Sequence, residues 1–158
     1  MATLDAQVQW QVENLLARYG HALDDDRLED WPGFFAESGR YRITTAENHA
    51  RGLPLCIVQA DSQAMMRDRV AALRHANIYE AQAYRHLVSA TLITRVENGV
   101  VEAVSNFHVA RIMHDGATML FATGRYIDRI RLGDIALFED KLVLLDSRRI
   151  DTLLAIPL

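Results

Sequence analysis

The chain has 158 residues, of which 50% are hydrophobic and 24% charged, and its formal net charge at pH 7 is −4. This composition is typical of a globular protein, so we expect a single domain over residues 1–158. The acidic balance argues against nucleic-acid binding, which needs a basic patch or stripe. No apolar run reaches the length of a membrane-spanning helix, and the first eleven residues lack the features of a signal peptide. A cytoplasmic location is therefore expected.

Two residue types are scarce. Cys56 is the single cysteine, which excludes an internal disulfide, a CxxC pair and a zinc site with several thiolates. It also excludes a Rieske cluster held by this chain, because that cluster needs two Cys and two His ligands. Sixteen of the seventeen basic residues are arginine, and the lone lysine, Lys141, is predicted to lie in a turn. Arginine pairs with carboxylates through two hydrogen bonds and is enriched at protein interfaces.

The N-terminal residues have the apolar spacing of an amphipathic helix. One stripe consists of Val8, Val12, Leu15, Leu16, Tyr19 and Leu23, with Thr3 as the expected N-cap. Three aspartates at residues 24–26 are predicted to end this helix. A second stripe consists of Trp10, Asn14, Ala17 and His21. A large aromatic residue on that stripe either packs within the chain or contacts another chain.

Shorter elements are predicted after this helix. Asp26 and Glu29 have the spacing of a capping box, which indicates a second short helix ending near Phe35. Residues 40–45 predict a strand, and residues 46–60 predict mostly loop. A third helix is then expected, capped by Asp61 or Ser62 and carrying residue 77 near its end.

The second half of the chain predicts four strands, at residues 84–96, 100–114, 117–132 and 141–152. The turns between them contain Asn98–Gly99 and Asp115–Gly116, which are strong hairpin signals because such residues tolerate positive φ. Three helices followed by four antiparallel strands define an α+β domain.

Neither face of the second of these strands is cleanly polar. One face carries Val101, Ala103, Phe107, Val109 and Met113, and the other carries Val100, Val104, Ala110 and Ile112 among polar residues. An antiparallel sheet with one solvated face should alternate clearly between apolar and polar residues. We therefore expect helices to cover one face, and a ligand cavity or another subunit to cover the other.

The sequence contains no strong catalytic or metal-binding motif. The six histidines lack the spacing of a convergent metal site, and neither Ser105 nor Ser147 has a GxSxG context. His21 with residues 24–26 is a candidate acid–base pair, although aspartates after a helix are more often caps or solvated turns. Cys56 lies in an apolar run and is interpreted as a small buried residue. We assign no catalytic, cofactor-binding or metal-binding residue.

Charged residues within the predicted strands need partners, because an unpaired buried charge is costly. Those partners lie either within the chain or in another subunit. The candidate interface residues are Trp10, Arg85, His86, Asp146, Arg148 and Arg149.

Several segments resemble known families. Residues 19–24, 31–32 and 34–35 resemble the opening helices of the cystatin-like cone fold, which ketosteroid isomerases and scytalone dehydratases share. The chain further resembles the small (β) subunits of Rieske-type aromatic-ring-hydroxylating oxygenases, and most closely those of terephthalate dioxygenase and salicylate 5-hydroxylase. The matching segments are residues 41–44, 48–50, 52–53, 60–62, 73–74, 76–80, 84–86, 111–114, 146–147, 151–153 and 156–158.

This resemblance implies a cone fold and a structural role in an α₃β₃ oxygenase. The large (α) subunit of such enzymes holds the Rieske [2Fe-2S] cluster and the mononuclear Fe(II), and a reductase delivers electrons from NAD(P)H. The chain matches no catalytic motif of that large subunit, so no catalytic residue is carried over. Two alternatives stay open: a stand-alone cone-fold isomerase or dehydratase with a pocket near His21, and a small-ligand-binding module.

Overall fold

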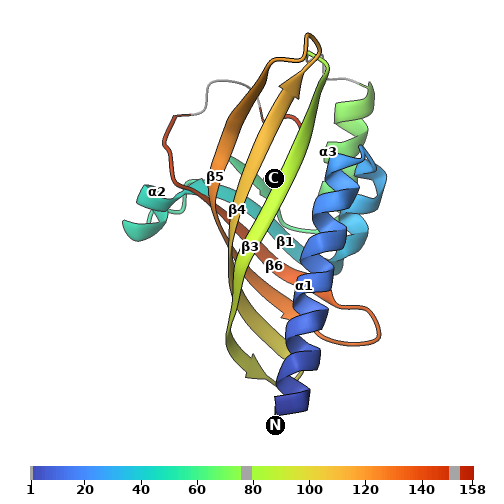
Figure 1. Cartoon of the computed structure of the whole chain (residues 1–158), viewed down its shortest axis with the longest axis vertical. Coiled ribbons are helices and arrows are strands. Elements are labelled where there is room, and N and C mark those ends of the chain that lie inside the picture. Colours follow the sequence, from blue (N-terminus) through green and yellow to red (C-terminus); the bar gives the residue numbers. More distant parts are fainter. Residues whose placement is uncertain (1, 76–79, 150–153) are drawn as a thin grey trace.

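The computed structural model describes residues 2–75, 80–149 and 154–158, which form a six-stranded sheet with helices packed on it (Figure 1). The helices are α1 (Ala2–Asp24), the 3₁₀ helix η1 (Leu28–Phe34), α2 (Ala46–Ala50) and α3 (Gln63–His75). The strands are β1 (Phe35–Thr45), β2 (Val58–Ala60), β3 (Gln82–Glu97), β4 (Val100–Met113), β5 (Thr118–Arg131) and β6 (Leu137–Leu145).

The strands lie in the order β2-β1-β6-β5-β4-β3, so β2 and β3 are the edges of the sheet. Strands β3 to β6 form an antiparallel meander, and β1 pairs in parallel with β6. Asn98 and Gly99 take positive φ angles of 52° and 75° in the β3–β4 turn, which confirms the predicted hairpin. Helices followed by an antiparallel meander confirm the α+β prediction.

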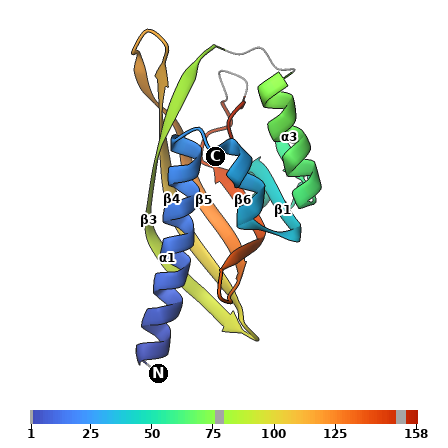
Figure 2. The same cartoon turned by 90° about the vertical axis from the view of Figure 1, so that its right-hand side faces the viewer.

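Helix α1 packs its first stripe on the sheet. Val12, Leu15, Tyr19 and Leu23 are buried, because this spacing places them on one face of the helix. Figure 2 shows α1 and α3 on the same side of the sheet, with the C-terminal residues between them. The second stripe faces outward, and the Trp10 side chain is 63% exposed. Trp10 therefore does not pack on a second face within this chain.

Several predicted boundaries in the first half were wrong. The η1 helix has Arg27 at its N-cap, with no side-chain capping bond, so Asp26 and Glu29 form no capping box. Both acids instead bind the Arg74 guanidinium at the end of α3. Strand β1 begins five residues early, because Phe35 already pairs with β6. The predicted loop contains the short elements α2 and β2.

The third predicted helix is confirmed as α3. The Ser62 hydroxyl accepts a hydrogen bond from the Met65 amide at 3.2 Å, which is the capping contact expected at this end. The prediction that residue 77 lies near the end of this helix concerns a position outside the described residues.

The last strand begins and ends earlier in the chain than predicted. Strand β6 covers Leu137–Leu145, whereas residues 141–152 were expected. Phe138 pairs with Ile130 of β5, so hydrogen bonding to the sheet begins before Lys141. Asp146, Arg148 and Arg149 thus follow the strand and are exposed, and the prediction that they lie within it was wrong.

The two faces of β4 differ in burial. Val101, Ala103, Phe107 and Val109 are buried in the core that α1 completes. On the opposite face Val104 and Ala110 are half-buried, and His108 is exposed. The described part of this chain therefore covers one face of the strand and leaves the other partly open.

Candidate functional site

A charged pair lies at the centre of the sheet, where the sequence had predicted a turn. Lys141 is in β6, fully buried, and its Nζ lies 3.2 Å from each carboxylate oxygen of Asp128. The same ammonium lies 3.5 Å from the ring centroid of Tyr126 and 4.4 Å from that of Phe138. Aromatic faces attract a desolvated cation. This environment neutralises the lysine charge within the chain.

Burial moves both pKa values toward the neutral forms. Desolvation raises the pKa of the Asp128 carboxyl to about 6, although the Lys141 charge opposes this shift. Desolvation likewise lowers the pKa of Lys141 to about 8 against the attraction of Asp128. Perturbed pairs of this kind often mark active sites. Here, however, both side chains are sealed from solvent, so the geometry indicates a structural pair.

The C-terminus of the chain occupies part of the space between the sheet and the helices. Leu158 is fully buried, and its main-chain oxygen accepts hydrogen bonds from the hydroxyls of Tyr19 at 2.8 Å and Tyr41 at 3.1 Å. The Trp31 indole donates to the Tyr19 hydroxyl at 3.2 Å. Burial raises the pKa of both tyrosines well above the ordinary value. These groups therefore satisfy one another's hydrogen bonds where the C-terminus enters the interior.

The predicted pair of His21 with the aspartates does not form. His21 is exposed, whereas Asp24 is nearly buried and binds His86 instead. The Asp24 carboxylate accepts the His86 main-chain amide at 2.9 Å and lies 2.6 Å from its Nδ1. The His86 side chain is 1% exposed. The sequence missed this pair because its partners are 62 residues apart, and the stand-alone enzyme built on His21 is not favoured.

The other candidate interface residues lie on the surface. Arg85 is exposed on β3, with its Nη1 3.9 Å from the Asp24 carboxylate. Arg148 is 77% exposed and lies 3.2 Å from Glu47. The Asp146 carboxylate accepts a hydrogen bond from the Thr123 hydroxyl at 3.0 Å. Arg149 makes no ion pair with any residue of the described ranges. The structure thus brings Arg85 and His86 together at Asp24, and places residues 146–149 elsewhere.

Within the described ranges, no three side chains of His, Cys, Asp and Glu gather closely enough to hold a metal ion. Cys56 is half-buried beside exposed Leu55, so it is less buried than the sequence predicted. Among the described residues, no helix is both long and apolar enough to cross a membrane.

The arrangement defines a cone-fold protein whose interior holds its own C-terminal residue. Residues 18–152 match the family described as ring hydroxylating beta subunit. The chain is 42% identical over 149 residues to subunit beta 1 of the terminal oxygenase component of terephthalate 1,2-dioxygenase from Comamonas sp, covering 94% of this chain and 97% of that subunit. It is 40% identical to the anthranilate 1,2-dioxygenase small subunit of Burkholderia cepacia, covering 99% and 98% of the two chains.

Solved structures of similar fold agree with this family match. A β subunit assigned to an aromatic-ring-hydroxylating dioxygenase of Novosphingobium aromaticivorans has a TM-score of 0.90 and 37% identity, covering 98% of this chain and 99% of that one. A protein of the same organism assigned as a scytalone dehydratase has a TM-score of 0.73 at 14% identity, covering 99% and 96%, which shows a shared fold. The predicted cone fold is confirmed, and the chain belongs to the ring-hydroxylating β subunit family.

Proposed function

We propose that the chain is the structural small subunit of a multicomponent aromatic-ring-hydroxylating dioxygenase, and that it supports assembly of an iron-containing large subunit during aromatic catabolism. The observation that carries this proposal is the likeness to the terephthalate 1,2-dioxygenase β subunit across nearly the whole chain. The positions of the candidate acid–base residues support it, because His21 is exposed and the neighbouring Asp24 binds His86 instead.

The redox groups belong to the partner in this proposal. The large subunit holds a Rieske [2Fe-2S] cluster and a mononuclear Fe(II), and a reductase supplies electrons from NAD(P)H. One cysteine cannot complete a Rieske ligand set, so the present chain leaves that chemistry to the large subunit. We further propose a cytoplasmic complex, since a lone thiol fits a reducing compartment.

The assembly is proposed to be an α₃β₃ hexamer in which the small subunits form a trimer. Exposed apolar side chains support a contact surface on α1 and the edge strand β3. This α1–β3 surface includes Trp10 on α1 and Leu87, Leu92 and Val96 on β3. Leu87 and Leu92 lie on the face of the sheet away from α1, because they pair with His108 and Val104 of β4. Exposed apolar groups along an unpaired strand edge are typical of a surface that a partner covers.

The charged interface candidates extend this surface. Arg85 adds an exposed guanidinium on β3, while His86 acts indirectly by anchoring the Asp24 carboxylate beside it. Arg148, together with Asp146 and Arg149, forms a second candidate contact after β6. Rim charges of this kind set orientation and partner choice more than affinity.

The substrate class is proposed from the relatives alone. The two curated relatives are named for terephthalate and anthranilate, which are both aromatic carboxylates. We propose that the complete enzyme acts on an aromatic ring that bears a carboxylate.

The test is co-expression with the large subunit. The isolated chain should carry no iron and hydroxylate no aromatic ring, whereas the co-purified complex should contain iron and oxidise an aromatic carboxylate with NAD(P)H and reductase. Iron analysis, sedimentation and product analysis measure these outcomes. Stoichiometric iron in the isolated chain, or ring hydroxylation by it, would overturn the proposal.

A further inference from the structure

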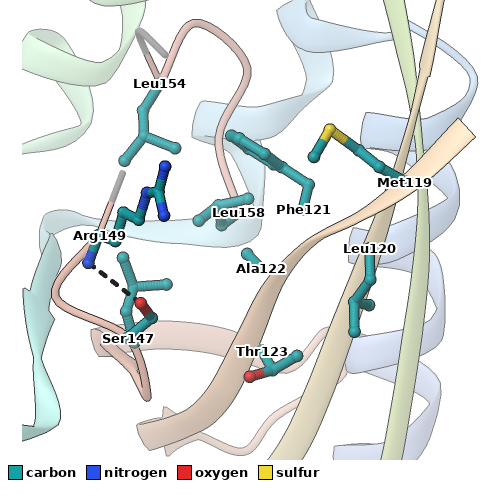
Figure 3. A pocket seen from close by; sticks show the side chains of 10 residues that line it. Met119, Leu120, Phe121, Ala122, Thr123, Ser147, Arg149, Leu154 and Leu158 are labelled. Carbon is teal, nitrogen blue, oxygen red and sulfur yellow. Dashed lines mark hydrogen bonds between the residues drawn. The ribbon is translucent and has the colours of Figure 1, made fainter. Parts of the chain in front are cut away.

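A cavity of about 400 Å³ lies between β5 and the chain that follows β6 (Figure 3). Its described lining consists of Met119, Leu120, Phe121, Ala122, Thr123, Leu145, Ser147, Arg149, Leu154 and Leu158. The volume falls within the range of about 300–1,000 Å³ that is typical of small-molecule sites. Most of these side chains are apolar, so the wall suits a hydrocarbon or aromatic body.

The polar groups of the described lining are cationic or neutral. Arg149 is the one charged residue of the described lining, and it has no acidic partner among the described residues. Its neighbour Arg148 lies outside this lining and is paired with Glu47. In Figure 3 the Arg149 side chain lies beside Leu154 and Leu158, across the cavity from Met119. An arginine beside an apolar wall, with no carboxylate partner in the described part of the chain, favours an anionic group.

One further group of the described lining adds to this preference. The Ser147 hydroxyl oxygen accepts a hydrogen bond from the Arg149 main-chain amide at 3.0 Å, which leaves its own O–H to donate to a ligand. Behind the wall, the Arg111 guanidinium lies 4.5 Å from the Phe121 ring centroid and 3.0 Å from the Met119 sulfur. Among the described residues, Asp146 is the acid that touches the lining, and it is bound to Thr123.

We propose that this cavity binds a small carboxylate attached to an apolar or aromatic body. The Arg149 guanidinium holds the carboxylate in a two-bond pair, Ser147 donates a further hydrogen bond, and Phe121, Leu154 and Leu158 contact the body. The inference uses only this chain's own residues and goes beyond the proposed subunit role. A carboxylate side chain of a partner protein is the rival occupant.

The test is a titration of the full-length chain with benzoate, followed by amide NMR, with benzamide as the uncharged analogue. Benzoate should bind with a dissociation constant on the order of 1 mM or below and should shift the amides of Ala122, Thr123 and Ser147. Benzamide should bind at least about tenfold more weakly. The Arg149→Gln variant should lose about tenfold in benzoate affinity. The matched Arg148→Gln variant should bind like the wild type.

A second variant separates the effect of cavity volume from the effect of the Arg149 charge. Ala122→Leu adds volume to the lining and should weaken benzoate while Arg149 stays in place, with thermal melting used to confirm folding. Equal binding of benzoate and benzamide would overturn the proposal, as would equal losses in the two arginine variants. The titration is repeated on the complex with the large subunit. Persisting shifts support a small-molecule site, whereas their disappearance would assign the cavity to a partner side chain and contradict the proposal.

Discussion

The interior of the cone and the α1–β3 surface differ in how their polar and apolar groups are placed. Polar groups are buried and paired in the interior, whereas apolar groups are exposed on the surface. Inside, Lys141 and Asp128 neutralise each other, and the Tyr19 and Tyr41 hydroxyls bind the main chain of Leu158. On the surface, Trp10 and Leu92 are exposed, and Arg85 has only a long contact to Asp24. The difference indicates that the interior serves folding and the surface serves association. Variants in the two regions should therefore change different measurements.

The largest effect is expected from Lys141→Met. Removing the ammonium leaves the Asp128 carboxylate buried without a counter-charge, which costs about 3–5 kcal/mol in comparable pairs. The free energy of unfolding, measured by urea denaturation at pH 7, should fall by that amount. The control is the double variant Asp128→Leu with Lys141→Met, which removes both charges and should recover most of the loss. A single variant within about 1 kcal/mol of the wild type would show that the pair is not desolvated as the geometry indicates.

The same pair should give stability a characteristic pH dependence. Asp128 has an ordinary pKa of 3.8 and a folded value of about 6, so the folded state binds the extra proton between these values. The free energy of unfolding should then fall as pH rises from 4 to 6. Lys141 has an ordinary pKa of 10.5 and a folded value of about 8, so the unfolded state binds the extra proton between pH 8 and 10.5. Stability should rise across that second window.

This pH dependence is measured as the difference between the wild type and the double variant, which cancels the other titrating groups. Each shifted pKa changes the free energy of unfolding by about 3 kcal/mol at most. The expected curve has its minimum between pH 6 and pH 8, where both groups are charged in the folded state. A maximum in that window would mean that the attraction between the charges outweighs their desolvation.

A smaller loss of stability is expected from Asp24→Ala, at the position where the interior meets the surface. Asp24→Ala removes the acceptor of the His86 amide and ring, leaving buried donors unsatisfied, so we expect a loss of about 2 kcal/mol. Denaturation and the His86 ring signals in NMR measure the change. Asp25→Ala is the matched control, because that carboxylate is exposed and its Arg27 contact is 3.7 Å long. Its effect should stay within about 0.5 kcal/mol, and equal losses would remove Asp24 from any anchoring role.

The local signals of the sequence predicted the elements of the fold well. Helical spacing located α1, and Asn98–Gly99 located the β3–β4 hairpin, because periodicity and turn chemistry act over a few residues. The boundaries of β1 and β6 were wrong because they depend on pairing between strands that are about a hundred residues apart. The family resemblance, in turn, correctly identified the cone fold and the β subunit family.

The polar interior could not be predicted in the same way. Lys141 looked like a turn residue because lysine is rarely fully buried unless it is paired. Its partner Asp128 lies on another strand, and only the register of β5 with β6 brings the two together. Likewise, His21 seemed the natural partner of Asp24, whereas the contact is made by His86 from β3. A single sequence gives no direct signal for such contacts.

The smallest effect on folding is expected from Trp10→Ser, and this variant tests the comparison most directly. The side chain is 63% exposed, so the free energy of unfolding of the isolated chain should change by no more than about 0.5 kcal/mol. If the α1–β3 surface is an interface, the same change should lower assembly affinity at least about thirtyfold, as truncation of a buried interfacial tryptophan does. Sedimentation of the chain alone, and of the complex with the large subunit, measures this change in assembly.

The matched control is Leu55→Ser, since Leu55 is 65% exposed near the opposite edge strand β2. Loss of assembly in the Trp10 variant alone, with both proteins equally stable, is the expected result. Unchanged sedimentation in both variants would remove α1 from the interface, and the exposed residues after β6 would become the remaining candidates.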